Sequence, residues 1–413
     1  MALSEKVLAL AEQVDAAVEP VLRRIDQVAR INTEKVLSAF RNNRVAETMF
    51  SGSTGYGNGD LGRDTLDRIF SEVFRTEDAL VRLQMVSGTH TLICALFGVL
   101  RPGDEMISLF GPPYDTLQTA IGLNGDAPGS LLDFGVRYSQ VESDAANQPD
   151  LPEIALVCAA RRPRLVLIQR SRGYSTRAAL SIDEIRAICE TVRAASPETV
   201  IFVDNCYGEF VDTREPTEVG ADLMAGSLIK NPGGGLAPMG GYIAGRHELV
   251  EAAAARLTSP GIGREQGATL GQNRLLYQGF FLAPHTVAQA LKTAVFCAKT
   301  MELLGYDSQP AWDALRSDIV QTVALGSEEA MLRFCLGIQK ASPVDSFVIP
   351  EAWPMPGYAD RVVMAAGAFV NGASIELSAD GPIRPPYLCY VQGGLTYEAG
   401  RLGILLAAEE LMK

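Results

Sequence analysis

Apolar side chains recur at helical spacing over the first part of the chain. Residues 2–48 therefore predict one or two amphipathic helices, and this segment carries no residue that points to catalysis. From residue 81 to residue 246, short runs rich in β-branched and aromatic residues alternate with helical segments. Such alternation is typical of an α/β fold with a mostly parallel sheet whose crossovers are right-handed.

Two of the apolar runs end in residues that can carry chemistry. Residues 199–203 predict a buried strand ending at Asp204, and residues 223–229 predict a second strand that delivers Lys230 to a comparable edge. Ligands bind at this edge in open α/β sheets. An amine beside a buried, glycine-flanked turn can stay partly neutral and form a Schiff base, while an upstream carboxylate can hold a pyridine nitrogen protonated. The pair therefore indicates a pyridoxal 5′-phosphate site.

Asp204, Lys230 and the glycines at 233–235 resemble those of the fold-type I pyridoxal phosphate enzymes, specifically the cystathionine β-lyase/methionine γ-lyase family. Segments 226–235 and 381–387 are similar to runs in its divergent aluminium-resistance, or methionine γ-lyase-related, branch. The resemblance spans roughly residues 30 to 410. It implies a mostly parallel seven-stranded sheet with helices on both faces and a smaller α+β domain at the C-terminus.

The length of the chain exceeds what one compact domain usually holds. With 413 residues, 47% of them hydrophobic, two domains around one site are expected. The predicted division is an N-terminal helical arm at 1–48, a large pyridoxal phosphate-binding α/β domain at 49–290 and a smaller C-terminal domain at 291–413.

Charge and cysteine content exclude several classes of partner. A net charge of −13 argues against nucleic acid and anionic membranes, which require clustered basic residues. The seven cysteines form no CxxC pair and show no metal-ligand spacing, so we expect free thiols in a reducing compartment and no metal. The N-terminus lacks an apolar stretch for export or for membrane spanning. We therefore expect a cytoplasmic protein.

The glycine-rich runs match neither G-x-G-x-x-G nor GxxxxGK followed by Ser or Thr, so nucleotide binding is not expected.

A phosphate-binding turn is predicted near residue 88. A strand at 81–86 is followed by Gly88 and Thr89 at the start of an apolar helix, where free N–H groups and the helix dipole bind anions. Any strand-to-helix turn can share this pattern, but its place ahead of Asp204 and Lys230 agrees with the family's order. The resemblance adds the Ser227 hydroxyl as a phosphate ligand.

The loop at 51–63 is too rich in glycine for the interior of an element. Composition alone is equally compatible with a plain flexible loop. The resemblance implies that Tyr56 and Arg63 reach across a dimer to the cofactor phosphate of the neighbouring subunit, although their spacing departs from the usual Tyr-x-Arg arrangement. It also implies a homodimer or homotetramer whose sites are shared between subunits.

Tyr114 follows a predicted strand at 104–110 and a pair of prolines. An aromatic side chain at a strand exit can stack on a cofactor ring, and a tyrosine can pass a proton. A surface loop is the alternative. Counted from the preceding glycine, Phe110 would occupy the usual stacking position, so Tyr114 is the prediction and Phe110 the alternative.

Two arginines are candidates for binding the substrate carboxylate. Arg384 follows a predicted strand at 374–378 and is flanked by prolines, and the resemblance places the carboxylate-binding arginine in this domain. Arg172 follows the predicted strand at 165–168, and a guanidinium at this edge can form two parallel hydrogen bonds to an anion. No role is assigned to Arg170. Both candidates are also compatible with solvated loop charges.

The resemblance implies a carbon–sulfur lyase that acts on a sulfur-containing amino acid. In this hypothesis Lys230 binds the cofactor covalently and later removes the Cα proton, Asp204 keeps the ring nitrogen charged, and Tyr114 assists. β- or γ-elimination then gives a 2-oxo acid, ammonia and a thiol. The alternatives are transamination or γ-replacement on another amino acid, and a noncatalytic binding protein with the same fold.

Overall fold

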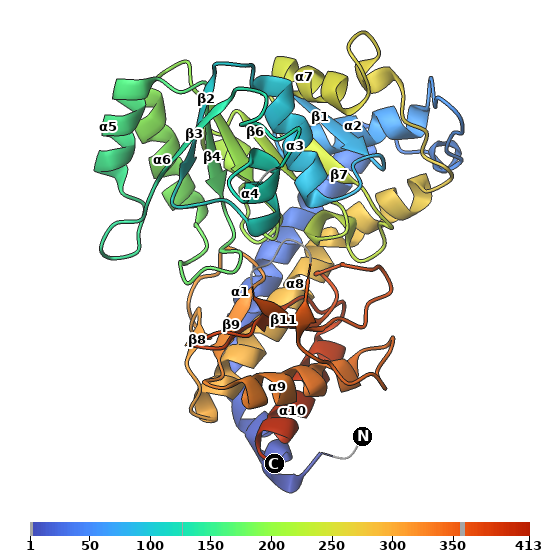
Figure 1. Ribbon diagram of the computed structural model, residues 1–413. Helices are drawn as coiled ribbons and strands as arrows, with labels where there is room; N and C mark the ends of the chain where they lie inside the picture. Colours follow the sequence, from blue (N-terminus) through green and yellow to red (C-terminus); the bar gives the residue numbers. More distant parts are fainter. Residues whose placement is uncertain (1–2, 126, 356–359) are drawn as a thin grey trace.

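The structure is a computed structural model that describes residues 3–125, 127–355 and 360–413. It contains two sheets, one in the upper and one in the lower part of Figure 1, with two long helices running between them. These helices are α1 (Glu5–Asn42) and α8 (Asn273–Leu303), which pack against each other. Within the described ranges, no helix combines the length and the apolar character that a membrane crossing needs.

The first sheet has seven strands in the order β1-β7-β6-β5-β4-β2-β3. Only β7 runs antiparallel to its neighbours, so the sheet is mostly parallel, as predicted. The strands are β1 (Asp78–Arg82), β2 (Glu105–Leu109), β3 (Arg137–Val141), β4 (Leu165–Gln169), β5 (Val200–Asp204), β6 (Leu223–Ser227) and β7 (Gly241–Gly245).

Helices cover both faces of this sheet. Along β5, Ile201 and Val203 belong to one apolar cluster and Val200 and Phe202 to another, because successive side chains of a strand point to opposite faces. The first cluster includes residues of α2 (Leu61–Val73), α5 (Leu151–Arg161), α6 (Ile182–Ala195) and α8, and the second residues of α3 (Gly88–Val99), α4 (Asp115–Ile121) and α7 (His247–Leu257). The predicted α/β fold with helices on both faces is confirmed.

The second sheet is antiparallel and has the order β10-β11-β12-β13-β9-β8. Its apolar side chains share a third cluster with residues of three helices, the end of α8 among them, and with the first part of α1. The elements are β8 (Ser308–Gln309), β9 (Gln321–Ala324), α9 (Glu328–Ala341), β10 (Trp353–Pro354), β11 (Arg361–Ala365), β12 (Ser378–Pro382), β13 (Leu388–Gln392) and α10 (Tyr397–Leu411).

One expectation about this part of the chain changes, and one stays untested. The predicted strand at 374–378 is wrong, because β12 begins only at Ser378. The preceding residues form a turn in which the buried carboxylate of Glu376 accepts the N–H groups of Phe369 and Val370, both at 2.9 Å. Helix α8 continues across the predicted domain boundary at 290/291 without a break, and the boundary itself stays a prediction.

Candidate active site

The carboxyl ends of β5 and β6 bring Asp204 and Lys230 to one place. The two strands are parallel neighbours with Asp204 opposite Ala225, and Lys230 follows the last residue of β6 by three positions. Both side chains line a cavity of about 110 Å³. The predicted convergence of this amine and this carboxylate is therefore present in the fold.

Lys230 is partly buried, and its Nζ lies 3.9 Å from the centre of the Tyr207 ring. Burial lowers the pKa of Lys230, but Cys206, Tyr207 and Asp204 together raise it above its ordinary value. Burial raises the pKa of Cys206 and of Asp204 as well, and the nearby amine opposes both rises. These neighbours favour the charged form of the amine, and a partly neutral Lys230 stays a prediction.

Asp204 is held inside the protein at the end of β5. Its Oδ1 accepts the N–H of Cys206 at 3.1 Å. Burial raises the pKa of Asp204, and the nearby Lys230 opposes this without reversing it. A carboxylate so enclosed is well placed to oppose a positive charge within the cavity, because little solvent screens it.

The first turn of α3 forms the anion-binding side of the same cavity. Gly88 and Thr89 line it, and a Cβ at Gly88 would lie 3.5 Å from the Ser227 Cβ. The Ser227 hydroxyl is buried and has no hydrogen-bond partner among the described residues. The Thr89 Oγ1 lies 2.6 Å from the Thr116 Oγ1. Free N–H groups at a helix N-terminus and an unsatisfied hydroxyl fit a phosphate.

These residues together fit pyridoxal 5′-phosphate. An amine, an enclosed carboxylate and an anion-binding turn surround one cavity, as that group requires. Tyr114 precedes α4 and lines the same cavity, and a Cβ at Gly173 would lie 3.0 Å from its ring. Phe110 is instead buried beneath the Arg177 guanidinium, which lies 4.8 Å from its ring centre. The structure thus brings Tyr114 to the cavity, and its stacking on a ring stays a prediction.

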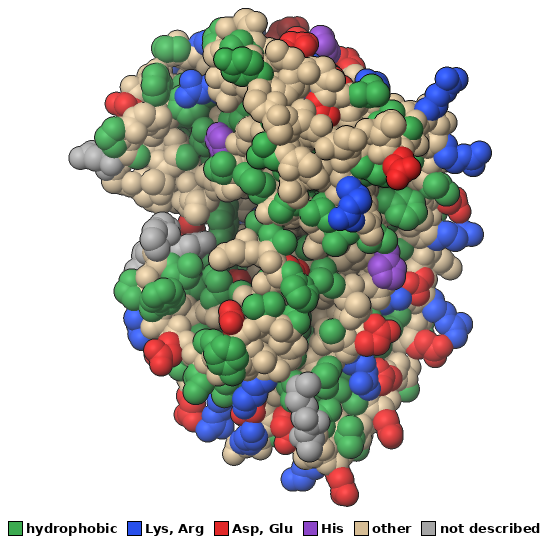
Figure 2. Space-filling model, turned by 90° about the vertical axis from the view of Figure 1, so that its right-hand side faces the viewer, with side chains coloured by type: hydrophobic (Ala, Val, Ile, Leu, Met, Phe, Trp, Pro, Cys, Tyr) green, Lys and Arg blue, Asp and Glu red, His purple; other side chains and the backbone are tan. Residues whose placement is uncertain are grey.

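A second cavity of about 240 Å³ adjoins the first and shares Lys230, Tyr114 and Tyr207 with it. Residues of the second sheet complete its lining, including Asp380 on β12 and Tyr390 on β13. In the space-filling view the molecule is hollowed on its left side, between the part with the first sheet and the part with the second (Figure 2). The larger cavity therefore has room for a substrate next to Lys230.

Neither predicted carboxylate-binding arginine is among the residues lining the two cavities. Arg384 is half exposed, and its Nη1 donates to the Asp360 carboxylate at 2.9 Å. Arg172 is buried, its Nη1 donates to the Thr322 hydroxyl at 3.2 Å, and its Nε has no hydrogen-bond partner in the described part of the chain. Arg170 is buried beside Asn205, to which it donates. The substrate-binding roles of Arg172 and Arg384 stay predictions.

The glycine-rich loop presents one of its two candidates outward. Tyr56 is 73% exposed and is free to meet another molecule, as a shared site requires. Arg63 is buried instead, and its Nη1 donates to the carbonyl oxygens of Gly57 and Gly267. Arg63 therefore holds the loop together, which contradicts the role that the resemblance implied for it.

Sequence reasoning missed several residues around the cavities. Tyr207 follows Asp204 by three positions and has a φ of 73°, a conformation that bulky residues adopt only where the surroundings impose it. Its aromatic ring directly after the strand was a usable signal. No such signal marks the other residues in the sequence, because no motif connects them along the chain. These residues are Asp380, Tyr174, Tyr390 and Gln392.

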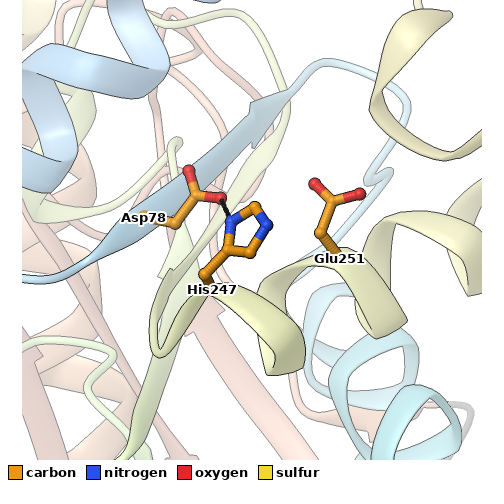
Figure 3. A group of neighbouring side chains, drawn as sticks. All are labelled: Asp78, His247 and Glu251. Atoms are coloured by element: carbon orange, nitrogen blue, oxygen red, sulfur yellow. Dashed lines mark hydrogen bonds and ion pairs between the residues drawn. The ribbon is translucent and has the colours of Figure 1, made fainter.

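One group of side chains outside the cavities has the composition of a metal site. The ligand atoms of Asp78, His247 and Glu251 lie within 4.8 Å of one another, and His247 Nδ1 is 2.7 Å from the Asp78 carboxylate (Figure 3). The Arg264 guanidinium already forms ion pairs with both carboxylates. Because Arg264 already bridges the two carboxylates, the group is a surface ion-pair network.

Comparison with known proteins places the chain among relatives of matching length. The model of the family described as "Methionine gamma-lyase" matches residues 7–412. YnbB of Bacillus subtilis (strain 168) is 50% identical over 406 residues, covering 98% of this chain and 96% of YnbB. A crystal structure described as a carbon-sulfur lyase involved in aluminum resistance, from Clostridium novyi NT, is 49% identical, with a TM-score of 0.95 over 98% of this chain and 96% of that one.

A more distant structure supports the fold alone. The pyridoxal-5′-phosphate-dependent protein YhfS of Escherichia coli is 17% identical, with a TM-score of 0.63 over 94% of this chain and 97% of that one. An identity this low says nothing about a shared reaction, since one fold hosts many activities.

Proposed function

Because the chain belongs to the methionine gamma-lyase family, we propose that it is a pyridoxal 5′-phosphate-dependent carbon–sulfur lyase that acts on a sulfur-containing amino acid. The products of β- or γ-elimination are a 2-oxo acid, ammonia and a thiol. The resemblance to the cystathionine β-lyase/methionine γ-lyase family and its aluminium-resistance branch is confirmed.

The convergence of Lys230, Asp204 and the turn at Gly88 and Thr89 on one cavity is the observation that carries the proposal. When bound, the cofactor supplies an electron sink for the electron pair left on the substrate Cα. We assign its phosphate to the N–H groups of Gly88 and Thr89 and to the unpaired Ser227 hydroxyl. Asp204 would hold the ring nitrogen protonated, because its carboxyl group is buried and lines the smaller cavity.

Lys230 is assigned the covalent attachment of the cofactor and the removal of the Cα proton. Its side chain lines both cavities, so one amine can serve the cofactor and the substrate. To act as a base it must first give up the proton that Asp204 and its other neighbours stabilise. Tyr114 also lines both cavities. We assign to it the stacking on the face of the cofactor ring and a proton transfer at the substrate.

The substrate carboxylate is assigned to Arg172 or Arg384. Arg172 is favoured because its Nε has no hydrogen-bond partner within residues 3–125, 127–355 and 360–413, and a buried donor of this kind gains most from an incoming anion. We further propose a homodimer or homotetramer in which the exposed Tyr56 completes the site of a neighbouring subunit.

The first experiment compares the native chain with Lys230→Ala. Borohydride reduction followed by mass spectrometry should show covalent cofactor on the native chain and none on the variant. Lys292→Ala is a matched control, because Lys292 is also largely buried but pairs with Asp26 on α1. The control should retain the cofactor, whereas covalent cofactor on Lys230→Ala would contradict the assignment.

The second experiment identifies the reaction. Cystathionine, cysteine, cystine, methionine and homocysteine are incubated with the enzyme, and the oxo acid formed is identified. Pyruvate indicates β-elimination and 2-oxobutyrate γ-elimination. Amino transfer that depends on an added keto acid, without release of a thiol, would replace the lyase with a transaminase.

A further inference from the structure

The larger cavity contains a carboxylate that the proposed reaction does not use. Asp380 lies on β12 and is 6% exposed. Its Oδ1 accepts the Tyr174 hydroxyl at 2.6 Å, and its Oδ2 accepts the Gln392 amide at 2.9 Å. All three side chains line the cavity of about 240 Å³ beside Lys230.

The charges around this cavity are unevenly distributed. Among the described residues that line it, Lys230 is the only basic side chain and Asp380 the only acidic one. Small or apolar residues form much of the remaining wall, including Val320, Met364 and Ala366. Under the proposed function Lys230 is committed to the cofactor and to the Cα proton, so Asp380 faces the substrate without a dedicated cation.

Asp380 is ionised near neutral pH. Burial raises its pKa to about 6, while the hydrogen bonds from Tyr174 and Gln392 and the charge of Lys230 limit the rise. An ionised carboxylate offers about four acceptor positions, and only two of them are used by these donors. Asp380 can therefore accept further hydrogen bonds from a substrate.

The chemistry of the substrate's far end decides whether this carboxylate helps or hinders binding. A side chain ending in a methyl group would cover the ionised Asp380, remove water from it and offer no partner, which is unfavourable. A side chain ending in a carboxylate would add repulsion. An ammonium group supplies both the missing charge and hydrogen-bond donors, and such charge-assisted bonds are strong.

We propose that Asp380, held by Tyr174 and Gln392, makes the enzyme select sulfur amino acids whose side chain beyond the sulfur carries an ammonium group. Asp380 thus acts as a specificity determinant. This inference rests on the proposed lyase function, because it assigns the larger cavity to the substrate.

Two substrates of equal size test the selection. S-(2-aminoethyl)-L-cysteine and S-propyl-L-cysteine have the same number of non-hydrogen atoms and differ only in a terminal ammonium or methyl group. The native enzyme should show a kcat/KM for the aminoethyl compound about 10- to 100-fold higher, as one charge-assisted hydrogen bond implies. Asp380→Asn should bring the ratio close to one, because it keeps an oxygen for Gln392 but removes the charge.

Two further variants separate recognition from folding and from net charge. Asp380→Glu retains the carboxylate and should keep a preference for the aminoethyl substrate. Glu329→Gln removes one negative charge from the exposed face of α9 and should leave the native ratio unchanged. If Asp380→Asn does not fold, the ratio of the two kcat/KM values in the native enzyme and in Asp380→Glu still tests the selection. A ratio close to one in the native enzyme would contradict it.

Binding without turnover gives a second readout. L-Lysine and L-2-aminoheptanoate also differ only in a terminal ammonium or methyl group, and neither has a carbon–sulfur bond to cleave. Calorimetry on the cofactor-loaded enzyme should show tighter binding of L-lysine, and Asp380→Asn should lose this difference.

The outcomes distinguish this inference from the function on which it rests. If both thioethers are cleaved with equal kcat/KM, the role of Asp380 is contradicted, whereas the lyase function is supported. Cleavage of no sulfur amino acid overturns the lyase. In that case equal affinity for L-lysine and L-2-aminoheptanoate also overturns the selection, and tighter binding of L-lysine upholds it.

Discussion

Glu209 is a buried carboxyl group behind the candidate site whose ionisation should control stability. Its Oε1 accepts the Tyr242 hydroxyl at 2.9 Å, and its Oε2 has no hydrogen-bond partner among the described residues. Burial raises the pKa of Glu209 to about 8, and the neighbouring carboxyl group of Glu215 adds to the rise. Glu209 should therefore hold its proton at neutral pH.

The size of the effect follows from linkage between protonation and folding. The pKa rises from 4.5 to about 8 on folding, and each pH unit corresponds to ~1.4 kcal/mol. Between these values the folded state binds more protons than the unfolded state, so the free energy of unfolding falls as pH rises. The total loss from Glu209 is on the order of 5 kcal/mol, and it is complete above the pKa of the folded state.

Glu209→Gln removes this dependence while preserving the shape of the side chain and an acceptor for Tyr242. Urea unfolding at intervals from pH 5 to pH 9, followed by circular dichroism, measures the free energy of unfolding of both proteins. Relative to the native chain, the variant should become more stable with each step toward pH 8 and then keep a constant advantage. Parallel curves for the two proteins over this range would refute the reasoning.

Four further variants test the site and its supports. Asp204→Asn should lower kcat by about 100-fold or more, since a preorganised charge is lost, and steady-state kinetics measures this. Arg172→Ala should raise the KM for an amino acid substrate by about tenfold or more. A larger rise in KM for Arg384→Ala would show that Arg384 binds the substrate carboxylate instead. Gly241→Ala should destabilise the fold by about 1–3 kcal/mol in urea unfolding, because its Cβ would overlap the buried Thr91 side chain.

The part of the site that could be predicted from the sequence lies on consecutive strands of the parallel sheet. Asp204 is the last residue of β5 and Lys230 follows β6 by three positions, and parallel strands place their carboxyl ends on one edge. Local sequence order is thus converted into spatial proximity. Gly88 and Thr89 follow the same rule, since they open the helix after β1.

The residues that could not be predicted make contacts between segments far apart along the chain. Asp380 meets Tyr174 across 206 positions of the chain, and no periodicity records such a distance. Arg63 was misjudged because the loop that encloses it is closed by Gly267, far along the chain. Local patterns determine helices and strands. The contact of Asp380 depends instead on how the second sheet docks onto the first, and that of Arg63 on how two distant loops of the first part of the chain meet.

Lys230 links the electrostatics of three carboxyl groups. Its positive charge lowers the pKa of Asp204, Glu209 and Asp380, each of which burial raises. Any step that neutralises the amine removes a cation from all three groups at once. Of the three, Glu209 can respond by keeping its proton, and Asp204 faces the smaller cavity, where the proposed ring nitrogen would oppose it. Asp380 alone among them lines the larger cavity, so an ammonium group on the substrate is the cation that can replace Lys230 there.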